Sequence, residues 1–292
     1  MTATCSVRRR WLTGDGVRLR AVTAGDPHGP PVVLLHGFPE FWYGWRRQIG
    51  PLAAAGFHVV ALDQRGYNRS DKPPRVAGYA TDRLAADVVK CLDDLNVSRA
   101  AVVGHDWGGG VGWHVAAAHP DRVSKLVVLN CPHPVAMHAA LEGSWAQLAR
   151  SWYVFAFQVP GVPERVAAWS DFRLLTRLMR RTSRPGTFSD RDLRLYRRAW
   201  ARPGAMTAMV NWYRAAARFG PRLPSPRVRV PTLLLWGQRD RFLGPDLAYA
   251  SANLCDDVRL VRFPAATHWL PHEEPAEVNR LIAEFLSETI SA

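Results

Sequence analysis

The residue with the clearest chemical potential is a carboxylate set among glycines, Asp106, in the segment Gly-His-Asp-Trp-Gly-Gly at 104–109. The segment follows an apolar run and opens a helical pattern. Its G-x-D-x-G spacing is typical of a nucleophile elbow, the sharp strand-to-helix turn that exposes one side chain. We predict that Asp106 is a nucleophile, although an aspartate that only caps the following helix would fit the same position.

Two further residues complete a charge relay with Asp106. Asp240 lies in Gly-Gln-Arg-Asp just after an apolar run, and His268 lies in Ala-Thr-His-Trp after the last such run. The chain order nucleophile, acid, histidine is that of a triad whose members lie on strand-end loops, so His268 is the predicted base. His272 is the nearest competing base, but its His-Glu-Glu-Pro context is typical of a helix N-terminus.

The segment His-Gly-Phe-Pro at 36–39 directly follows the first buried apolar run. Where a nucleophile elbow occurs, the loop at this place supplies one backbone N–H of the oxyanion hole, and the residue after the nucleophile supplies the other. Pro39 has no N–H. The predicted donors are therefore the backbone N–H groups of Phe38 and Trp107.

Short apolar runs must position these residues. Continuous Val- and Leu-rich runs are typical of strands covered on both faces, and here they occupy 31–35, 58–62, 100–104, 125–130, 232–236 and 258–263. Helical patterns lie at 82–95, 107–119 and 275–287. The alternation predicts an α/β protein with a mostly parallel, doubly wound sheet. In such sheets ligands bind beyond the carboxyl ends of the strands.

The alternation stops between residues 132 and 226, where the pattern is helical and rich in Trp and Arg. We expect a helical cap, or lid, over 132–226, inserted between two strands of an α/β core formed by 1–131 and 227–292. A cap placed at the carboxyl ends of the strands would enclose the site.

The chain has 292 residues and a net charge of +13, and most of that charge falls near the predicted cap. Residues 161–230 hold 16 arginines and four acidic residues. A solvated, arginine-biased helical face explains this excess, and a basic surface for nucleic acid or membrane is the alternative. Because the segment has no zinc-binding or aromatic-interleaved motif, we expect no nucleic-acid partner.

The composition excludes several classes of protein. With 48% apolar residues, the chain suits one main globular domain with an insertion. It has no apolar run long enough to span a membrane and no secretory signal, so we expect a cytoplasmic location. Cys5, Cys91, Cys131 and Cys255 lie too far apart for a zinc motif or a dense disulfide framework, and we expect them to be small buried side chains.

Taken together, the motifs resemble those of epoxide hydrolases of the α/β-hydrolase superfamily. The resemblance covers about residues 8 to 288 and is carried by HGFPEFWYGWR (36–46), DQRGYNRSDKP (63–73), GHDWGG (104–109), WYVFAFQVPGVPE (152–164), NWYR (211–214) and THW (267–269). It implies the α/β-hydrolase fold in its soluble type, without an N-terminal phosphatase domain. Asn68 stands where many relatives have Gly, but Asn tolerates left-handed backbone angles, so the turn should survive.

The resemblance also implies two tyrosines that donate protons to the epoxide oxygen, Tyr153 and Tyr213. The implied reaction converts an apolar or aromatic epoxide to a vicinal diol with water, through an ester on Asp106 and without metal or cofactor. The alternative is a haloalkane or haloacid dehalogenase with the same Asp nucleophile, in which Trp107 could hold the halide. The sequence leaves the oligomeric state open, a homo-oligomer included.

Overall fold

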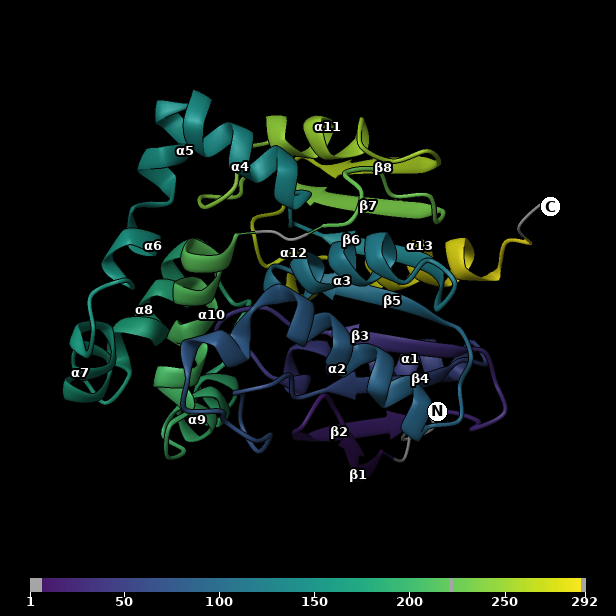
Figure 1. The fold of residues 1–292 in the computed structure, drawn as a ribbon, viewed down its shortest axis with the longest axis horizontal. Coiled ribbons are helices and arrows are strands. Elements are labelled where there is room, and N and C mark those ends of the chain that lie inside the picture. Colours follow the sequence, from purple (N-terminus) through teal and green to yellow (C-terminus); the bar gives the residue numbers. More distant parts are fainter. Residues whose placement is uncertain (1–6, 221–222, 290–292) are drawn as a thin grey trace.

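A computed structural model describes residues 7–220 and 223–289 of the chain. Its centre is an eight-stranded sheet in the order β1-β2-β4-β3-β5-β6-β7-β8 (Figure 1). Strands β3 to β8 are all parallel, whereas β1 and β2 pair antiparallel. The predicted α/β architecture with a mostly parallel sheet is confirmed. The strands are β1 (Arg8–Thr13), β2 (Arg18–Ala24), β3 (Pro31–Leu35), β4 (His58–Leu62), β5 (Ala100–His105), β6 (Val123–Leu129), β7 (Thr232–Gly237) and β8 (Val258–Phe263).

The sheet is covered on both faces, which explains why its central strands are continuously apolar. Along β3, Val33 and Leu35 join one buried cluster, and Val32 and Leu34 join another. Because successive side chains of a strand point to opposite faces, the two clusters lie on the two sides of the sheet. The surrounding elements are η1 (Trp42–Trp45), α1 (Ile49–Ala54), η2 (Val76–Tyr79), α2 (Thr81–Asp94), α3 (Trp107–Ala118), α11 (Asp246–Ala252), α12 (Leu270–Glu273) and α13 (Pro275–Ser287).

The two edges of the sheet differ from the sequence-based expectation. Strands β1 and β2 were not predicted. In β1 only Leu12 is buried, so its apolar signal is weak, and in β2 the arginines Arg18 and Arg20 interrupt the apolar run although most of the strand is buried. The run 258–263 was expected to be covered on both faces, but β8 forms the opposite edge and only Phe263 is buried. An edge strand has one neighbour instead of two, so part of its side chains stays in solvent.

Between β6 and β7 the chain forms a succession of helices. Figure 1 shows them, in teal and green, gathered at one end of the sheet. The helical character of this segment was predicted, and the cap boundaries at 132 and 226 stay a prediction. The helices are α4 (Pro134–Gly143), α5 (Trp145–Arg150), α6 (Trp152–Ala156), α7 (Val162–Trp169), α8 (Arg173–Thr182), α9 (Asp190–Trp200) and α10 (Ala205–Phe219).

Smaller features also agree with the sequence. Asn68 adopts a positive φ of 42°, as its turn requires, and its side-chain amide donates to Asp63 at 2.8 Å. Cys91, Cys131 and Cys255 are free and buried, whereas Cys5 lies outside the described residues. No helix in the described ranges is long and apolar enough to cross a bilayer.

Candidate active site

Asp106 occupies a strained turn between β5 and α3. Its backbone angles are φ 51° and ψ −126°, a conformation that is rare outside glycine. The flanking glycines make the turn feasible: a Cβ on Gly104 would lie 2.3 Å from the Gly108 carbonyl oxygen, and one on Gly108 would lie 2.0 Å from that of Leu35. The G-x-D-x-G spacing therefore reflects backbone crowding, and the turn has the geometry of a nucleophile elbow.

The Asp106 carboxylate lies against the loop that follows β3. The Phe38 N–H donates to Oδ1 of Asp106 at 2.7 Å. A Cβ on Gly37 would lie 2.4 Å from the Cβ of Asp106, so only glycine lets this loop approach. The Trp107 N–H begins helix α3 and has no intrahelical acceptor, as at any helix start. The Phe38 N–H thus lies against the carboxylate, whereas the oxyanion hole formed by Phe38 and Trp107 stays a prediction.

His268 connects Asp106 to a second carboxylate. Its Nδ1 lies 2.7 Å from Oδ2 of Asp240, and its Nε2 lies 3.5 Å from Oδ2 of Asp106. Asp240 is held in turn by the N–H groups of Phe242 at 2.7 Å and Leu243 at 3.0 Å, both donating to Oδ1. The three residues predicted as a triad are therefore brought together, with Nδ1–H donating to Asp240 and Nε2 facing Asp106.

Asn130, at the carboxyl end of β6, also positions Asp240, a role that was not predicted from the sequence. Its amide donates to Oδ2 of Asp240 at 2.8 Å, while its Oδ1 accepts the N–H of Gly237 at 2.9 Å. Asn130 has a positive φ of 42°, which asparagine tolerates. A polar residue ending an otherwise apolar strand was the available sequence signal.

The ionisation of the site follows from these contacts. Burial disfavours the charged form of the His268 imidazole, but the charge of Asp240 and the hydrogen bonds to both carboxylates outweigh it, and the pKa of His268 rises to about 10. For Asp106, burial opposes ionisation, yet the hydrogen bond and charge of His268, with His105 and the Phe38 N–H, lower the pKa of the carboxyl. Asp106 is therefore ionised at neutral pH.

The two predicted tyrosines converge on Asp106 from different helices. Tyr213, on α10, is buried, with its ring 4.9 Å from that of Trp107 and 5.3 Å from that of Phe38. Tyr153, on α6, lies 5.9 Å from the Tyr213 ring. Burial raises the pKa of both phenols, and the negative charge of Asp106 adds to the shift. Both tyrosines are therefore protonated and able to donate.

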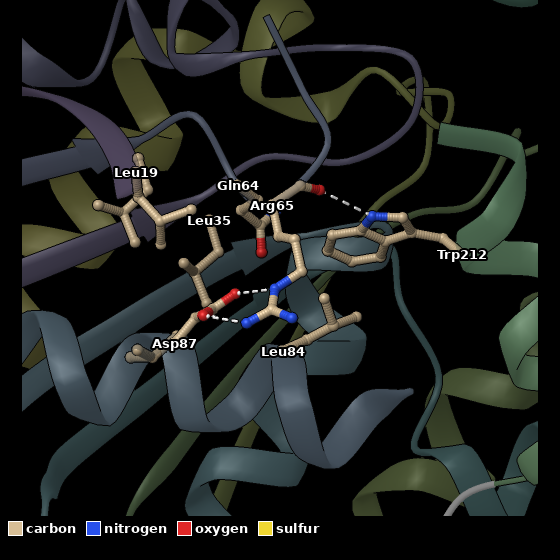
Figure 2. Close-up of a pocket in the computed structure, with 9 residues that line it drawn as sticks. Leu19, Leu35, Gln64, Arg65, Leu84, Asp87 and Trp212 are labelled. Atoms are coloured by element: carbon tan, nitrogen blue, oxygen red, sulfur yellow. Dashed lines mark hydrogen bonds and ion pairs between the residues drawn. The ribbon is translucent and has the colours of Figure 1, made fainter. Parts of the chain in front are cut away.

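Helix α10 is attached to the core through the residue before Tyr213. Figure 2 shows the Trp212 indole donating to the Arg65 carbonyl oxygen at 3.0 Å. The Arg65 guanidinium forms a buried, bidentate pair with Asp87, at 2.7 and 2.8 Å. A small cavity lies beside this pair, lined also by leucines of the sheet and of α2. These bonds hold α10 at the strand ends, so Tyr213 faces the nucleophile.

The relationship to known proteins agrees with this geometry. A model of the alpha/beta hydrolase fold family matches residues 30–275. The mouse (Mus musculus) protein named Epoxide hydrolase 4 is 38% identical over 290 residues, which are 97% of this chain and 79% of that protein. The chain belongs to the α/β-hydrolase family and, within it, to the epoxide hydrolases.

Two further relatives are similar over nearly the whole chain. The AB hydrolase superfamily protein YfhM of Bacillus subtilis (strain 168) is 42% identical over 281 residues, covering 96% of this chain and 98% of that protein. The crystal structure of a mutant epoxide hydrolase from Bacillus megaterium, complexed with its naphthyloxy-propanediol product, has a TM-score of 0.89 at 30% identity and covers 96% of this chain and 100% of that one. The family resemblance seen in the sequence is confirmed.

In this epoxide-hydrolase fold the competing base, His272, has another environment. Its Nε2 bonds Oε1 of Glu40 at 2.8 Å, and its Nδ1 lies 3.1 Å from Arg46. The buried Glu40 also accepts the Tyr196 hydroxyl and faces His105 at 3.4 Å. No local pattern marks Glu40, Tyr196 or His105 as partners of His272, because residues 40 and 272 are separated by most of the chain.

Aromatic rings line the approach to Asp106 in this epoxide hydrolase. Phe157 lies 4.9 Å from Tyr213 and 5.8 Å from Tyr153, measured between ring centroids. Phe242 lies 5.7 Å from Tyr153 and 5.2 Å from His268. Neither phenylalanine was singled out in the sequence. The nucleophile thus faces an environment that favours apolar and aromatic groups.

Proposed function

We propose that this protein hydrolyses an apolar or aromatic epoxide to a vicinal diol through a covalent ester on Asp106. The observation that carries the proposal is the convergence on one ionised carboxylate of a histidine at 3.5 Å, a backbone N–H at 2.7 Å and two tyrosines, of which Tyr213 is buried and Tyr153 half-buried. Membership of the epoxide hydrolases supports the same reaction. Each component has one task in a two-step displacement.

In the first step, an oxygen of Asp106 attacks a ring carbon of the epoxide from the side opposite the breaking C–O bond. The pair of electrons from that bond goes to the epoxide oxygen, which takes a proton from one of the two tyrosines, Tyr153 and Tyr213, while the other donates a hydrogen bond. Such a phenol stays protonated at neutral pH and can act as an acid. The tyrosinate regains a proton from His268, which is then free to act as the base of the second step. The product is a glycol monoester of Asp106.

In the second step, His268 accepts a proton from water, and the resulting hydroxide attacks the carboxyl carbon of the ester. Asp240 holds the imidazole in the required orientation, as in other triads. The backbone N–H groups of Phe38 and Trp107 stabilise the tetrahedral oxyanion. The ester bond to the glycol then breaks, the departing alkoxide takes the proton of the new carboxyl group, and Asp106 is regenerated as a carboxylate beside the protonated His268.

The chemistry explains why the nucleophile is an aspartate. A serine nucleophile suits acyl substrates, whose own carbonyl carbon is attacked by water in the second step. An epoxide has no carbonyl, so the ester carbonyl must come from the enzyme. The aromatic residues around Asp106 favour epoxides with aryl or long apolar substituents.

A single turnover in water enriched in heavy oxygen tests this mechanism. Because water attacks the carboxyl carbon of Asp106, the label should enter Asp106 first and appear in the diol only in later turnovers. Peptide mass spectrometry of the protein and of the diol would show both. A diol labelled in the first turnover, with no label in Asp106, would mean that water attacks the epoxide directly.

The alternative reaction, dehalogenation, shares the nucleophile and the base. It needs a halide-binding pair, for which the Trp107 indole is the candidate. Release of halide from haloalkanes, without diol formation from a panel of aryl and alkyl epoxides, would favour it. The two convergent tyrosines support the epoxide reaction instead.

We also propose that residues 132–226 form the cap of this enzyme, over a core of 1–131 and 227–292. Two residues of the cap, Tyr153 and Tyr213, then complete a site whose other members belong to the core. A cytoplasmic location and a homo-oligomeric state stay predictions from the sequence. Size-exclusion chromatography with light scattering would test the oligomeric state, and fractionation of cells would test the location.

A further inference from the structure

Helices α5 to α8 form an edge of the molecule that is unusually apolar for a surface. Nine of the thirteen exposed large apolar side chains in the described ranges lie on this edge, between residues 145 and 178. Trp145 and Trp169 are 86% and 88% exposed, and Trp152 is 67% exposed. In Figure 1 these helices lie along one side of the molecule, remote from the C-terminus. Such a concentration marks an interaction surface.

The same edge carries positive charge that no acidic side chain neutralises. Its two acidic residues, Glu164 and Asp171, pair with Arg214 and Arg197 of the neighbouring helices. Arg180 forms an ion pair with Asp190. Within the part of the chain that the structure describes, the other exposed arginines of the edge form no ion pair; they are Arg165, Arg173, Arg177 and Arg181. The partner of this surface must therefore be apolar and anionic at once.

Helix α8 shows the combination within a single element. Leu174 and Leu178 are exposed one turn apart, and Arg173, Arg177 and Arg181 accompany them along the helix. A polar face of arginines beside exposed leucines and tryptophans is typical of helices that lie in the membrane interface. Tryptophan side chains prefer the headgroup level of a bilayer. A second copy of this chain would instead bring unneutralised arginines against each other.

We propose that the edge formed by α5 to α8 docks on a membrane surface rich in anionic lipid. The lipid headgroups would pair with the free arginines, and the tryptophans would enter the interface between headgroups and acyl chains. Docking would leave the sheet and the C-terminal helix facing the solvent.

The edge lies next to the active site, so docking would bring the site close to the membrane. That docking serves substrate capture rests on the proposed function. Helix α6 carries Trp152 on the exposed edge and, next in sequence, Tyr153, whose ring lies 5.9 Å from Tyr213 inside the site. Apolar epoxides partition into bilayers. A docked enzyme would meet its substrate where that substrate is most concentrated.

Vesicle sedimentation with the full chain tests the docking without any epoxide. The probes are vesicles of phosphatidylcholine alone and of phosphatidylcholine mixed with phosphatidylglycerol. We expect binding to the mixed vesicles only, weakened by added salt because the arginine contribution is electrostatic. A blue shift of tryptophan fluorescence should accompany binding, since the exposed indoles leave water.

Two variants separate the apolar and charged contributions. Trp145→Ser/Trp169→Ser should reduce partitioning at least tenfold, whereas Trp11→Ser, at an exposed tryptophan on β1, should not. Each arginine near an anionic leaflet contributes about fivefold, so Arg173→Gln/Arg177→Gln/Arg181→Gln should lose roughly a hundredfold. The matched control Arg9→Gln/Arg10→Gln/Arg99→Gln removes the same charge elsewhere. All four variants should keep the hydrolysis rate for a water-soluble epoxide, which shows that they fold.

Three results would overturn the proposal. The first is no binding of the wild type to phosphatidylglycerol vesicles. The second is equal loss of binding in the edge variants and in their controls, which would indicate non-specific attraction by the net charge. The third is a dimer in light scattering that Trp145→Ser/Trp169→Ser converts to a monomer, because the edge would then join two copies of the chain. If the wild type bound the vesicles but hydrolysed no epoxide, the proposed function would be contradicted while the docking proposal would stand.

Discussion

Nε2 of His268 lies 3.5 Å from Oδ2 of Asp106, on the side of the imidazole away from its 2.7 Å contact with Asp240. Two carboxylates therefore support the imidazolium and raise the pKa of His268 to about 10, against the effect of burial. In the proposed mechanism, esterification of Asp106 removes one of these charges. The mechanism therefore predicts that the pKa of His268 falls when the ester forms, so that His268 becomes a base only when there is an ester to hydrolyse.

Replacing Asp106 by Asn should imitate this change without any substrate. The amide carries no charge, so the pKa of His268 should fall from about 10 towards its ordinary 6.5, while Asp240 still keeps it above that value. Titration of the imidazole by NMR measures the shift. Asp94→Asn, at an exposed carboxylate on α2, is the control. An unchanged pKa of His268 in Asp106→Asn would contradict the coupling between the two residues.

The same coupling predicts how the stability of the free protein depends on pH. A pKa that is higher in the folded than in the unfolded protein stabilises the fold fully below the unfolded value, near 6.5, and the gain is lost as pH rises through about 10. Denaturant unfolding at several pH values should show this loss, amounting to a few kcal/mol at most. Asp106→Asn should flatten the dependence. If the free energy of unfolding of the wild type rose with pH between about 6.5 and 10, the result would contradict this prediction.

His268→Gln should separate the two chemical steps. Attack by Asp106 needs no base, so the ester should still form, whereas its hydrolysis should slow by roughly 10²–10⁴ without the general base. Intact-mass measurement after addition of an aryl epoxide should show a stable adduct. Asp106→Ala, which has no nucleophile, should show none. An adduct absent from His268→Gln or present in Asp106→Ala would refute the assigned roles.

Tyr213→Phe should act on the first step alone. Loss of one donor to the epoxide oxygen should slow ring opening by about 10² and leave ester hydrolysis nearly unchanged. Rapid mixing with tryptophan fluorescence separates the two rates. Tyr153→Phe should behave alike, and the exposed Tyr249→Phe should not. If hydrolysis of the ester slows instead, the tyrosines serve the second step.

Gly37→Ala should displace the nucleophile. The new methyl would lie 2.4 Å from the Cβ of Asp106, so the loop or the carboxylate must move. We expect loss of most activity and a destabilisation of about 1–3 kcal/mol from overpacking. Activity assays and thermal unfolding measure both effects. Gly143→Ala, where the added methyl has open space, should leave both unchanged, and equal behaviour of the two variants would disprove the steric explanation.

The sequence by itself determined the central sheet and the triad. Asp106, Asp240 and His268 each follow an apolar run, and the carboxyl ends of parallel strands meet at one edge of a sheet, so their proximity could be inferred without coordinates. The glycines around Asp106 indicated the turn, because backbone crowding there leaves no space for a larger side chain. Local chemistry and strand topology were sufficient for these residues.

The tertiary structure alone decided the features that depend on contacts between distant elements. Asn130 bonds Asp240, and Glu40 bonds His272 across 232 positions of the chain. The edge strand β1 was not predicted, because only one of its residues is buried and the sequence therefore shows no apolar pattern there. Tyr153 was assigned by family resemblance, since it lies on a helix whose packing against the core no local pattern specifies. Spacing along a chain predicts which residues share a strand end or a helix face, but only the packed structure brings side chains of separate elements together.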